Sequence, residues 1–162
     1  MASALRHGLL EGVAVAVAGD ESVAARCAEL GARVGTLVAD LADEDAVAAA
    51  IGAVDGIDVL ACATCELDGA FIAARAAANA WIAAERGGKV VLVAPAGDAP
   101  LQAALENLAR TLSIEWARYG ITPTAVLPGD ATSPEEVAEL LAFLASPAGD
   151  YYSGCSFSLG RA

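Results

Sequence analysis

The stretch 89–127 decides the fold, because it consists of a strand-like run, a helix-like run and a second strand-like run. KVVLVA (89–94) is continuously apolar, as strands are when both faces of a parallel sheet are covered. LQAALENLARTLSIEWARY (101–119) has the apolar spacing of an amphipathic helix, and Gly120 is suited to end it. ITPTAVL (121–127) is strand-like again. A strand–helix–strand unit of this length predicts a parallel α/β sheet.

The same alternation continues in both directions along the chain. Valines at every second position of 13–17 predict a first strand, and SPEE (133–136) supplies an N-cap, a proline and a capping-box glutamate for a late helix. The pattern therefore predicts a single domain over residues 1–162 with a doubly wound parallel α/β sheet. The expected strands are 13–18, 32–38, 58–63, 89–94, 121–127 and 156–159, and the expected helices are 20–30, a segment from the acidic run 40–45 to about 54, 67–86, 101–119 and 133–145.

Composition and charge exclude several classes of function. The formal net charge is −12, and the nine basic residues are scattered rather than clustered. Nucleic acids and anionic membranes need a basic patch, so we expect neither as a partner. The apolar run 9–18 has features of a signal peptide, but Glu11 and Gly12 interrupt it, and its alternation favours a strand. We therefore expect a cytoplasmic protein.

The order of segments resembles the short-chain dehydrogenase/reductase family, and four stretches carry the resemblance. LENLARTLSIEWARYGI (105–121) is similar to the long helix after the family's catalytic lysine, and VLPG (126–129) to the strand end beside the nicotinamide. EEVAELLAFLAS (135–146) is similar to the C-terminal helix, and YYSG (151–154) to the turn before the last strand. The segments GARV and DVL that begin at Gly31 and Asp58 fit the second and fourth family strands. The chain is shorter than family members, so the resemblance implies a truncated Rossmann-like three-layer sandwich.

The resemblance also allows the family's catalytic positions to be checked. The family uses a tyrosine, a lysine four residues later and a serine at the preceding strand end. In this chain Asp98 stands at the tyrosine position, Gln102 at the lysine position and Pro95 at the serine position. A neutral glutamine cannot stabilise a phenolate. The only lysine is Lys89, and no tyrosine lies four residues before it, so we expect no catalytic residue.

The cofactor positions are altered as well. The family's glycine-rich turn lets the backbone approach a pyrophosphate at a helix N-terminus. Here Gly19 is followed directly by Asp20 and Glu21, whose carboxylates would repel phosphates. Asp40 is a possible relic of the acid that contacts adenosine, while ACATC (61–65) replaces the family's asparagine-containing motif. We therefore expect no bound cofactor.

The segments that join subunits in the family are retained. There, the long helix and its predecessor form a four-helix bundle between subunits, and the last helix and strand form a second contact. The resemblance thus implies a non-catalytic subunit that assembles with an active NAD(P)-dependent paralogue, of acyl-CoA or steroid/hydroxyacyl metabolism. The alternatives are a residual oxidoreductase or small-ligand (acyl-CoA-like) binding domain acting alone, and a self-assembling structural domain. The candidate interface residues are Trp81, Ala104, Asn107, Thr111, Ile114, Phe157 and Leu159.

Three further patterns have alternative interpretations. Cys62-x-x-Cys65 is a potential redox or metal pair, but too few further ligands are available, and we expect buried thiols and no metal. Asp20 with Asp58 or Asp98 is a potential acidic phospho-acceptor pocket, although the lysine that such pockets use on a late strand is missing. Asp98 and Gln102 are a potential new acid/base pair, or polar residues at a helix start.

Overall fold

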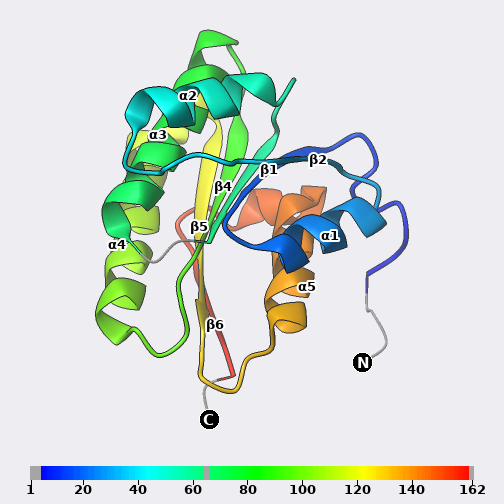
Figure 1. Ribbon diagram of the computed structural model, residues 1–162, viewed down its shortest axis with the longest axis vertical. Coiled ribbons are helices and arrows are strands. Elements are labelled where there is room, and N and C mark those ends of the chain that lie inside the picture. The colour runs from blue at the N-terminus through cyan, green and yellow to red at the C-terminus, as the bar shows by residue number, and fades with distance from the viewer. Residues whose placement is uncertain (1–4, 64–65, 161–162) are drawn as a thin grey trace.

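Six parallel strands form one sheet in the order β2-β1-β3-β4-β5-β6 (Figure 1). The computed structural model describes residues 5–63 and 66–160. The strands are β1 (Ala14–Ala18), β2 (Arg33–Thr36), β3 (Val59–Ala63), β4 (Gly88–Val93), β5 (Ile121–Pro128) and β6 (Ser156–Leu159). The helices are α1 (Glu21–Glu29), α2 (Glu44–Ala53), α3 (Leu67–Ala83), α4 (Ala99–Glu115) and α5 (Pro134–Ala145), with 3-10 turns at Ala117–Tyr119 and Pro147–Tyr151. The predicted doubly wound parallel α/β fold is confirmed.

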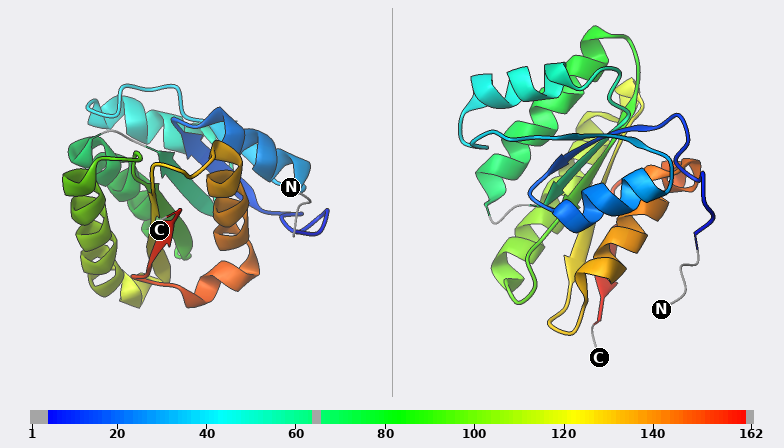
Figure 2. Two further views of the ribbon diagram at one scale, coloured as in Figure 1. Left: turned by 90° about the horizontal axis from the view of Figure 1, so that it is seen from below. Right: turned by 45° about the vertical axis from the view of Figure 1, so that its right-hand side comes forward.

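The helices cover both faces of the sheet. α1 packs against α5 on one face, and α2, α3 and α4 pack side by side on the other (Figure 2). Alternate strand residues supply the two halves of the core: Leu60 and Leu92 point to the α3 side, and Val59 and Val91 to the α1 side. Alanines fill the buried face of α3, which lets this helix approach the sheet closely. The result is the expected three-layer sandwich.

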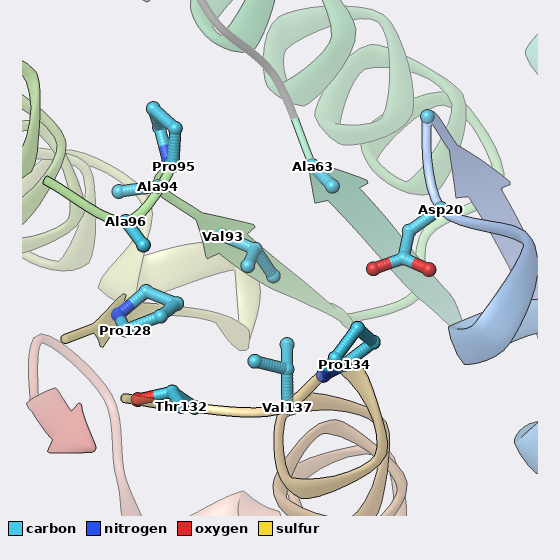
Figure 3. A pocket seen from close by; sticks show the side chains of 11 residues that line it. Asp20, Ala63, Val93, Ala94, Pro95, Ala96, Pro128, Thr132, Pro134 and Val137 are labelled. Atoms are coloured by element: carbon cyan, nitrogen blue, oxygen red, sulfur yellow. The ribbon is translucent and has the colours of Figure 1, made fainter. Parts of the chain in front are cut away.

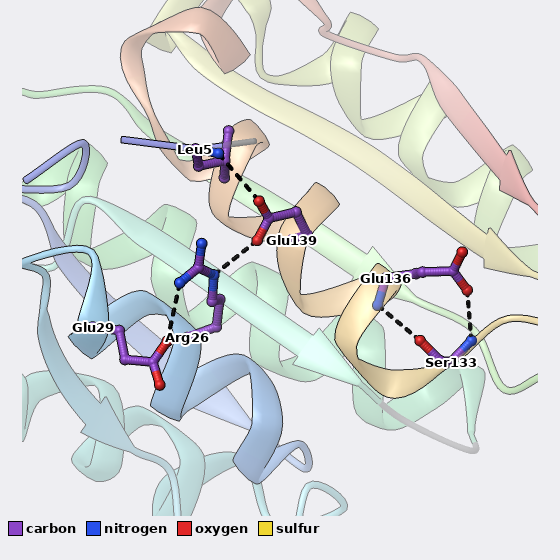
Figure 4. A network of polar contacts seen from close by, with 6 residues as sticks. All are labelled: Leu5, Arg26, Glu29, Ser133, Glu136 and Glu139. Carbon is purple, nitrogen blue, oxygen red and sulfur yellow. Dashed lines mark hydrogen bonds and ion pairs between the residues drawn. The ribbon is translucent and has the colours of Figure 1, made fainter. Parts of the chain in front are cut away.

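A polar network links α1, α5 and the N-terminal segment at Leu5 on the α1 side of the sheet (Figure 4). Arg26 of α1 donates through Nε to Glu139 of α5 at 2.8 Å and pairs with Glu29 at 3.0 Å. The backbone N–H of Leu5 donates to the other Glu139 oxygen at 3.3 Å. At the start of α5, Ser133 and Glu136 form the predicted capping box.

Several element ends differ from the expected ones for local reasons. α3 ends at Ala83, three residues early, because Glu85 adopts a left-handed backbone with φ of 53° and turns the chain toward β4. α4 begins at Ala99 because Asp98 caps it. β2 is four residues long and pairs on one side only, with β1. Within the described ranges, no helix has both the length and the apolar character needed to cross a membrane.

The strand order places a topological switch point beside β1. The chain passes from β1 to β2 on one side and returns to β3 on the other side of β1. In doubly wound sheets, ligands bind outside the carboxyl ends of the strands at this point. The common order 3-2-1-4-5-6 also places a further strand outside strand two. Within residues 5–63 and 66–160 no strand occupies that position, and β2 forms the edge of the described sheet.

Candidate functional site

A cleft of about 280 Å³ lies at the carboxyl ends of β1, β3, β4 and β5 (Figure 3). It therefore sits at the switch point, where a doubly wound sheet binds ligands. Its walls are mostly apolar side chains, including Val93, Pro95, Pro128 and Val137. Among the described residues that line it, Asp20 alone carries a charge. The cleft thus offers no cationic group to a phosphate.

Asp20 occupies the position at the start of α1 where a phosphate would bind. Its Oδ1 accepts hydrogen bonds from Ser22 N at 2.9 Å, Ser22 Oγ at 2.6 Å and Val23 N at 3.3 Å. In phosphate-binding folds those helix N–H groups are left for the ligand. Here the protein's own carboxylate satisfies them, and Figure 3 shows that carboxylate facing the cleft. Glu21 adds a second negative charge in the first turn of α1.

Gly19 brings the end of β1 into close contact with the end of β3. Its φ is 88°, and a Cβ on it would lie 2.1 Å from the carbonyl oxygen of Ala63. The turn between β1 and α1 consists of Gly19 and Asp20 alone. It is too short for a glycine-rich loop that wraps around a pyrophosphate.

Gln102 has a structural role at the position where the family resemblance places the catalytic lysine. Its side chain is 5% exposed, and Nε2 donates to Pro95 O at 3.1 Å and to Pro128 O at 2.7 Å. The amide therefore joins the segments that follow β4 and end β5. A lysine ammonium could satisfy the same carbonyls, but a buried cation would need a compensating anion.

The Asp98 side chain also accepts a hydrogen bond from the backbone. Its Oδ1 accepts from Leu101 N at 3.0 Å and caps α4, and its side chain is exposed. The acid/base pair of Asp98 and Gln102 is thus not formed, since each side chain is committed to backbone groups. Pro95 lines the cleft without a hydroxyl. Thr132 is the hydroxyl residue that the sequence did not reveal: its Oγ accepts from Gly129 N at 3.0 Å at the cleft wall.

The other predicted acids lie away from the cleft. Asp40 accepts from Ala42 N at 3.0 Å in the exposed turn after β2. Asp58 precedes β3 at the amino end of the sheet, where it accepts from Ala14 N at 2.8 Å and pairs with Arg86 at 3.1 Å. Asp20 follows β1 at the carboxyl end. An acidic pocket of Asp20 and Asp58 is therefore wrong, because the two carboxylates lie at opposite ends of parallel strands.

Two described cysteines, Cys27 and Cys62, are buried. Burial raises the pKa of Cys62 to about 12 and that of Cys27 to about 11. Cys155 is exposed, and Cys65 lies outside the described residues. No group of three or more potential metal ligands comes together within residues 5–63 and 66–160. Cys62 is a small apolar core residue of β3.

We predict that the buried thiols make the protein less stable at alkaline pH. In the unfolded chain both thiols ionise near their ordinary pKa of 9.0, whereas in the folded chain they stay protonated to higher pH. The raised pKa values therefore contribute fully to the free energy of unfolding below pH 9. This contribution is lost as the pH rises through the folded-state pKa values of about 11 and about 12. Urea unfolding of the protein and of Cys62→Ala between pH 7 and 10.5 measures this effect. The decline above pH 9 should be shallower in Cys62→Ala, and equal slopes would contradict the prediction.

Trp81 is a correction to the predicted interface. It is 1% exposed within the single chain, and its Nε1 donates to Ile57 O at 2.6 Å, so it is a core residue with no surface left for a partner. The other six predicted interface residues keep exposed surface. Ala104 is half-buried and Asn107, Thr111 and Ile114 are exposed on α4, while Phe157 and Leu159 are half-buried on the edge strand β6.

Comparison with known proteins identifies the fold. No family model matches the sequence, and no curated protein sequence matches it either. A hydroxysteroid dehydrogenase from Escherichia coli superposes with a TM-score of 0.81 at 16% identity, over 93% of this chain and 97% of that one. A short-chain type dehydrogenase/reductase from Mycobacterium marinum gives a TM-score of 0.81 at 20% identity, over 92% of this chain and 94% of that one. The chain therefore has the Rossmann-like α/β fold of the short-chain dehydrogenases/reductases.

Proposed function

We propose that this protein is a non-catalytic subunit that assembles with an active NAD(P)-dependent short-chain dehydrogenase. The observation that carries the proposal is the use of Gln102 as a buried link between two strand ends. A side chain in that role cannot hold a ribose or lower the pKa of a tyrosine, which are the tasks of the lysine that the family resemblance places there.

The neighbouring positions support the same conclusion. Asp98 caps α4 and Asp20 caps α1, so each carboxylate stabilises a helix where the family places a catalytic tyrosine or a bound pyrophosphate. The altered residues thus have structural roles of their own, as expected for a chain that is retained as a stable fold. A chain that keeps the fold but not the catalytic residues is suited to bind a chain in which those residues are present.

The outer surface of α4 supports assembly. Ile114 is 76% exposed, and Asn107 and Thr111 share its side of the helix at spacings of seven and three residues. An apolar side chain with that exposure on a polar helix face is suited to contact another helix. We propose this surface as one contact with the active subunit and the open side of β6 as a second.

The test is co-expression with a short-chain dehydrogenase encoded by an adjacent gene, followed by purification through one chain. We expect a stable complex for the natural protein and loss of the complex for Ile114→Asp, because a carboxylate there would have to be desolvated. Ala48→Asp is the matched control, since Ala48 is exposed on α2 away from the proposed contact. Absence of any complex with the natural chain would contradict the proposal.

We predict that the isolated protein binds neither NAD(H) nor NADP(H). Asp20 and Glu21 repel a pyrophosphate, and Asp20 already occupies the donors at the start of α1. Isothermal titration calorimetry with millimolar dinucleotide should give no binding heat. The double variant Asp98→Tyr/Gln102→Lys should remain inactive, because it restores side chains but not the phosphate turn. Dinucleotide binding by the natural chain would overturn the proposal.

We also propose the substrate class of the active partner, which is an acyl-CoA, steroid or hydroxyacyl compound. One of the similar structures named above is a hydroxysteroid dehydrogenase, which favours the steroid part of this class. The second candidate function is binding of a small ligand by the chain alone, and the apolar cleft is the observation that favours it. Because Asp20 lies in the wall, such a ligand would be uncharged rather than a phosphate-bearing thioester. Calorimetry with a hydroxysteroid and with an acyl-CoA separates these cases.

A further inference from the structure

We propose that the open edge of β2 binds an extended, positively charged segment of a partner protein as an additional strand. This surface lies at the opposite edge of the sheet from β6 and is separate from the contact on α4. The proposal therefore does not depend on the assembly described above.

The first observation is a set of unpaired backbone groups on β2. Arg33 N donates to Val13 O at 2.9 Å and Leu37 N to Val17 O at 2.8 Å, so these alternate groups face β1. By the alternation of a parallel ladder, the N–H and C=O groups of Val34 and Thr36 face the other way. No described strand pairs with that side. An edge of this kind is a template for strand addition.

The second observation is exposed apolar surface in line with the strand. Val38 follows β2 and is 90% exposed, the highest exposure among the large apolar side chains of the described residues. At the other end of β2, a groove of about 220 Å³ is lined in part by Val34, Gly35, Ala53 and Val54. An added strand would cover Val38 at one end and place a side chain in this groove at the other. Apolar surface at both ends is what a bound segment would bury.

The third observation is the charge around the edge, which selects the partner. Asp40, Asp43 and Asp45 are exposed in the turn and the first residues of α2 after β2, and Asp55 lines the groove. Arg33 is the basic residue of β2, and its Nη1 is directed to the carbonyl of Asp55 at 3.4 Å. A second copy of this chain would bring two such sets of carboxylates together, in molecules with a net charge of −12 each. A basic segment is attracted instead.

The probe is a synthetic peptide, Lys-Val-Thr-Val-Lys-Val-Thr-Val-Lys, added to the full chain while amide hydrogen exchange is followed by NMR. We expect the outward amides of Val34 and Thr36 to exchange at least about tenfold more slowly with the peptide bound. A peptide with glutamate in place of lysine should give no protection. Equal protection by both peptides would overturn the proposal, since charge would then play no part.

Two proline variants form a matched pair for this test. Thr36→Pro removes an outward donor of β2 and leaves the bonds to β1, so the protection should disappear. Ser158→Pro makes the same change on β6. There, Ala125 N donates to Cys155 O and Gly129 N donates to Leu159 O, so by alternation the Ser158 amide faces outward. It should leave peptide binding unchanged, and loss of binding in this variant as well would contradict the proposal.

Fold integrity and self-association are checked in the same experiment. The amides of Val15 and Val17 in β1 report whether Thr36→Pro keeps the sheet. If they lose protection, Val38→Lys serves as the second variant and should weaken peptide binding at least about fivefold, through lost apolar burial and repulsion between the new ammonium and the basic peptide. Unchanged binding in Val38→Lys would overturn the proposal. Protection of Val34 and Thr36 that grows with protein concentration, without peptide, would identify a second copy as the occupant and would also overturn it.

Discussion

Replacing Trp81 by alanine is expected to lower the free energy of unfolding by about 3–5 kcal/mol, the largest loss from any side-chain truncation proposed here. The indole is 1% exposed and packs beneath the sheet next to Gly88, where a Cβ would lie 2.2 Å from the ring. Truncation would leave a cavity that the alanine-rich α3 cannot fill. It would also leave the carbonyl of Ile57 without its indole donor.

Trp116 provides the control for this prediction. It is the other tryptophan and lies at the end of α4, where it is only partly buried against the core. Trp116→Ala should therefore cost about 1–2 kcal/mol. Urea unfolding followed by circular dichroism measures both variants, and each keeps one tryptophan as a fluorescent reporter. Equal losses in the two variants would show that Trp81 is not the packing centre that its burial indicates.

Replacing Gly19 by alanine is expected to destabilise the protein by about 3 kcal/mol or more, although only one methyl group is added. Two effects combine. The φ of 88° disfavours any residue with a Cβ, and the methyl group would lie 2.1 Å from Ala63 O. Relief requires β1 and β3 to move apart at their carboxyl ends, which disturbs the hydrogen-bonded ladder between these two strands.

Gly12 separates these two effects. Its φ is 83°, almost the same, but a Cβ there would meet no atom within 4 Å. Gly12→Ala therefore carries the backbone cost alone, about 1–2 kcal/mol. The difference between the two variants in thermal or urea unfolding measures the close approach of β1 to β3. If Gly19→Ala is no worse than Gly12→Ala, the turn is looser than described and has room for a ligand.

The strands and caps were predictable because their signals are local. The apolar run 89–94 predicts β4, and the Ser133–Glu136 capping box predicts the start of α5. The ends of α3 and β2 were not predictable to the same accuracy. Glu85 takes a left-handed conformation that only Gly or Asn would have signalled, and β2 is limited by the absence of a neighbouring strand, which is a tertiary property.

The sequence predicts which of the family's catalytic residues are missing from the candidate site, but not the structural roles of the residues that stand in their place. The missing lysine and tyrosine positions follow from the sequence once the family resemblance is seen, as does the shortened turn after Gly19. The link from Gln102 to two carbonyls could not be read from sequence, since its partners lie seven and 26 residues away. The family resemblance predicts an interface position for Trp81, but an aromatic residue on a helix does not reveal which side the sheet covers.

The two-residue turn between β1 and α1 also bears on the history of the fold. A side chain can be exchanged through a single codon change, whereas a longer loop needs an insertion in frame and in register. Any insertion here would displace Asp20 from the start of α1 and separate Gly19 from Ala63. Each intermediate with a longer turn would be less stable than the present chain. Descendants of this chain are therefore expected to diversify on the outer surfaces of the sheet and helices, because a longer turn at this position would cost stability at each step.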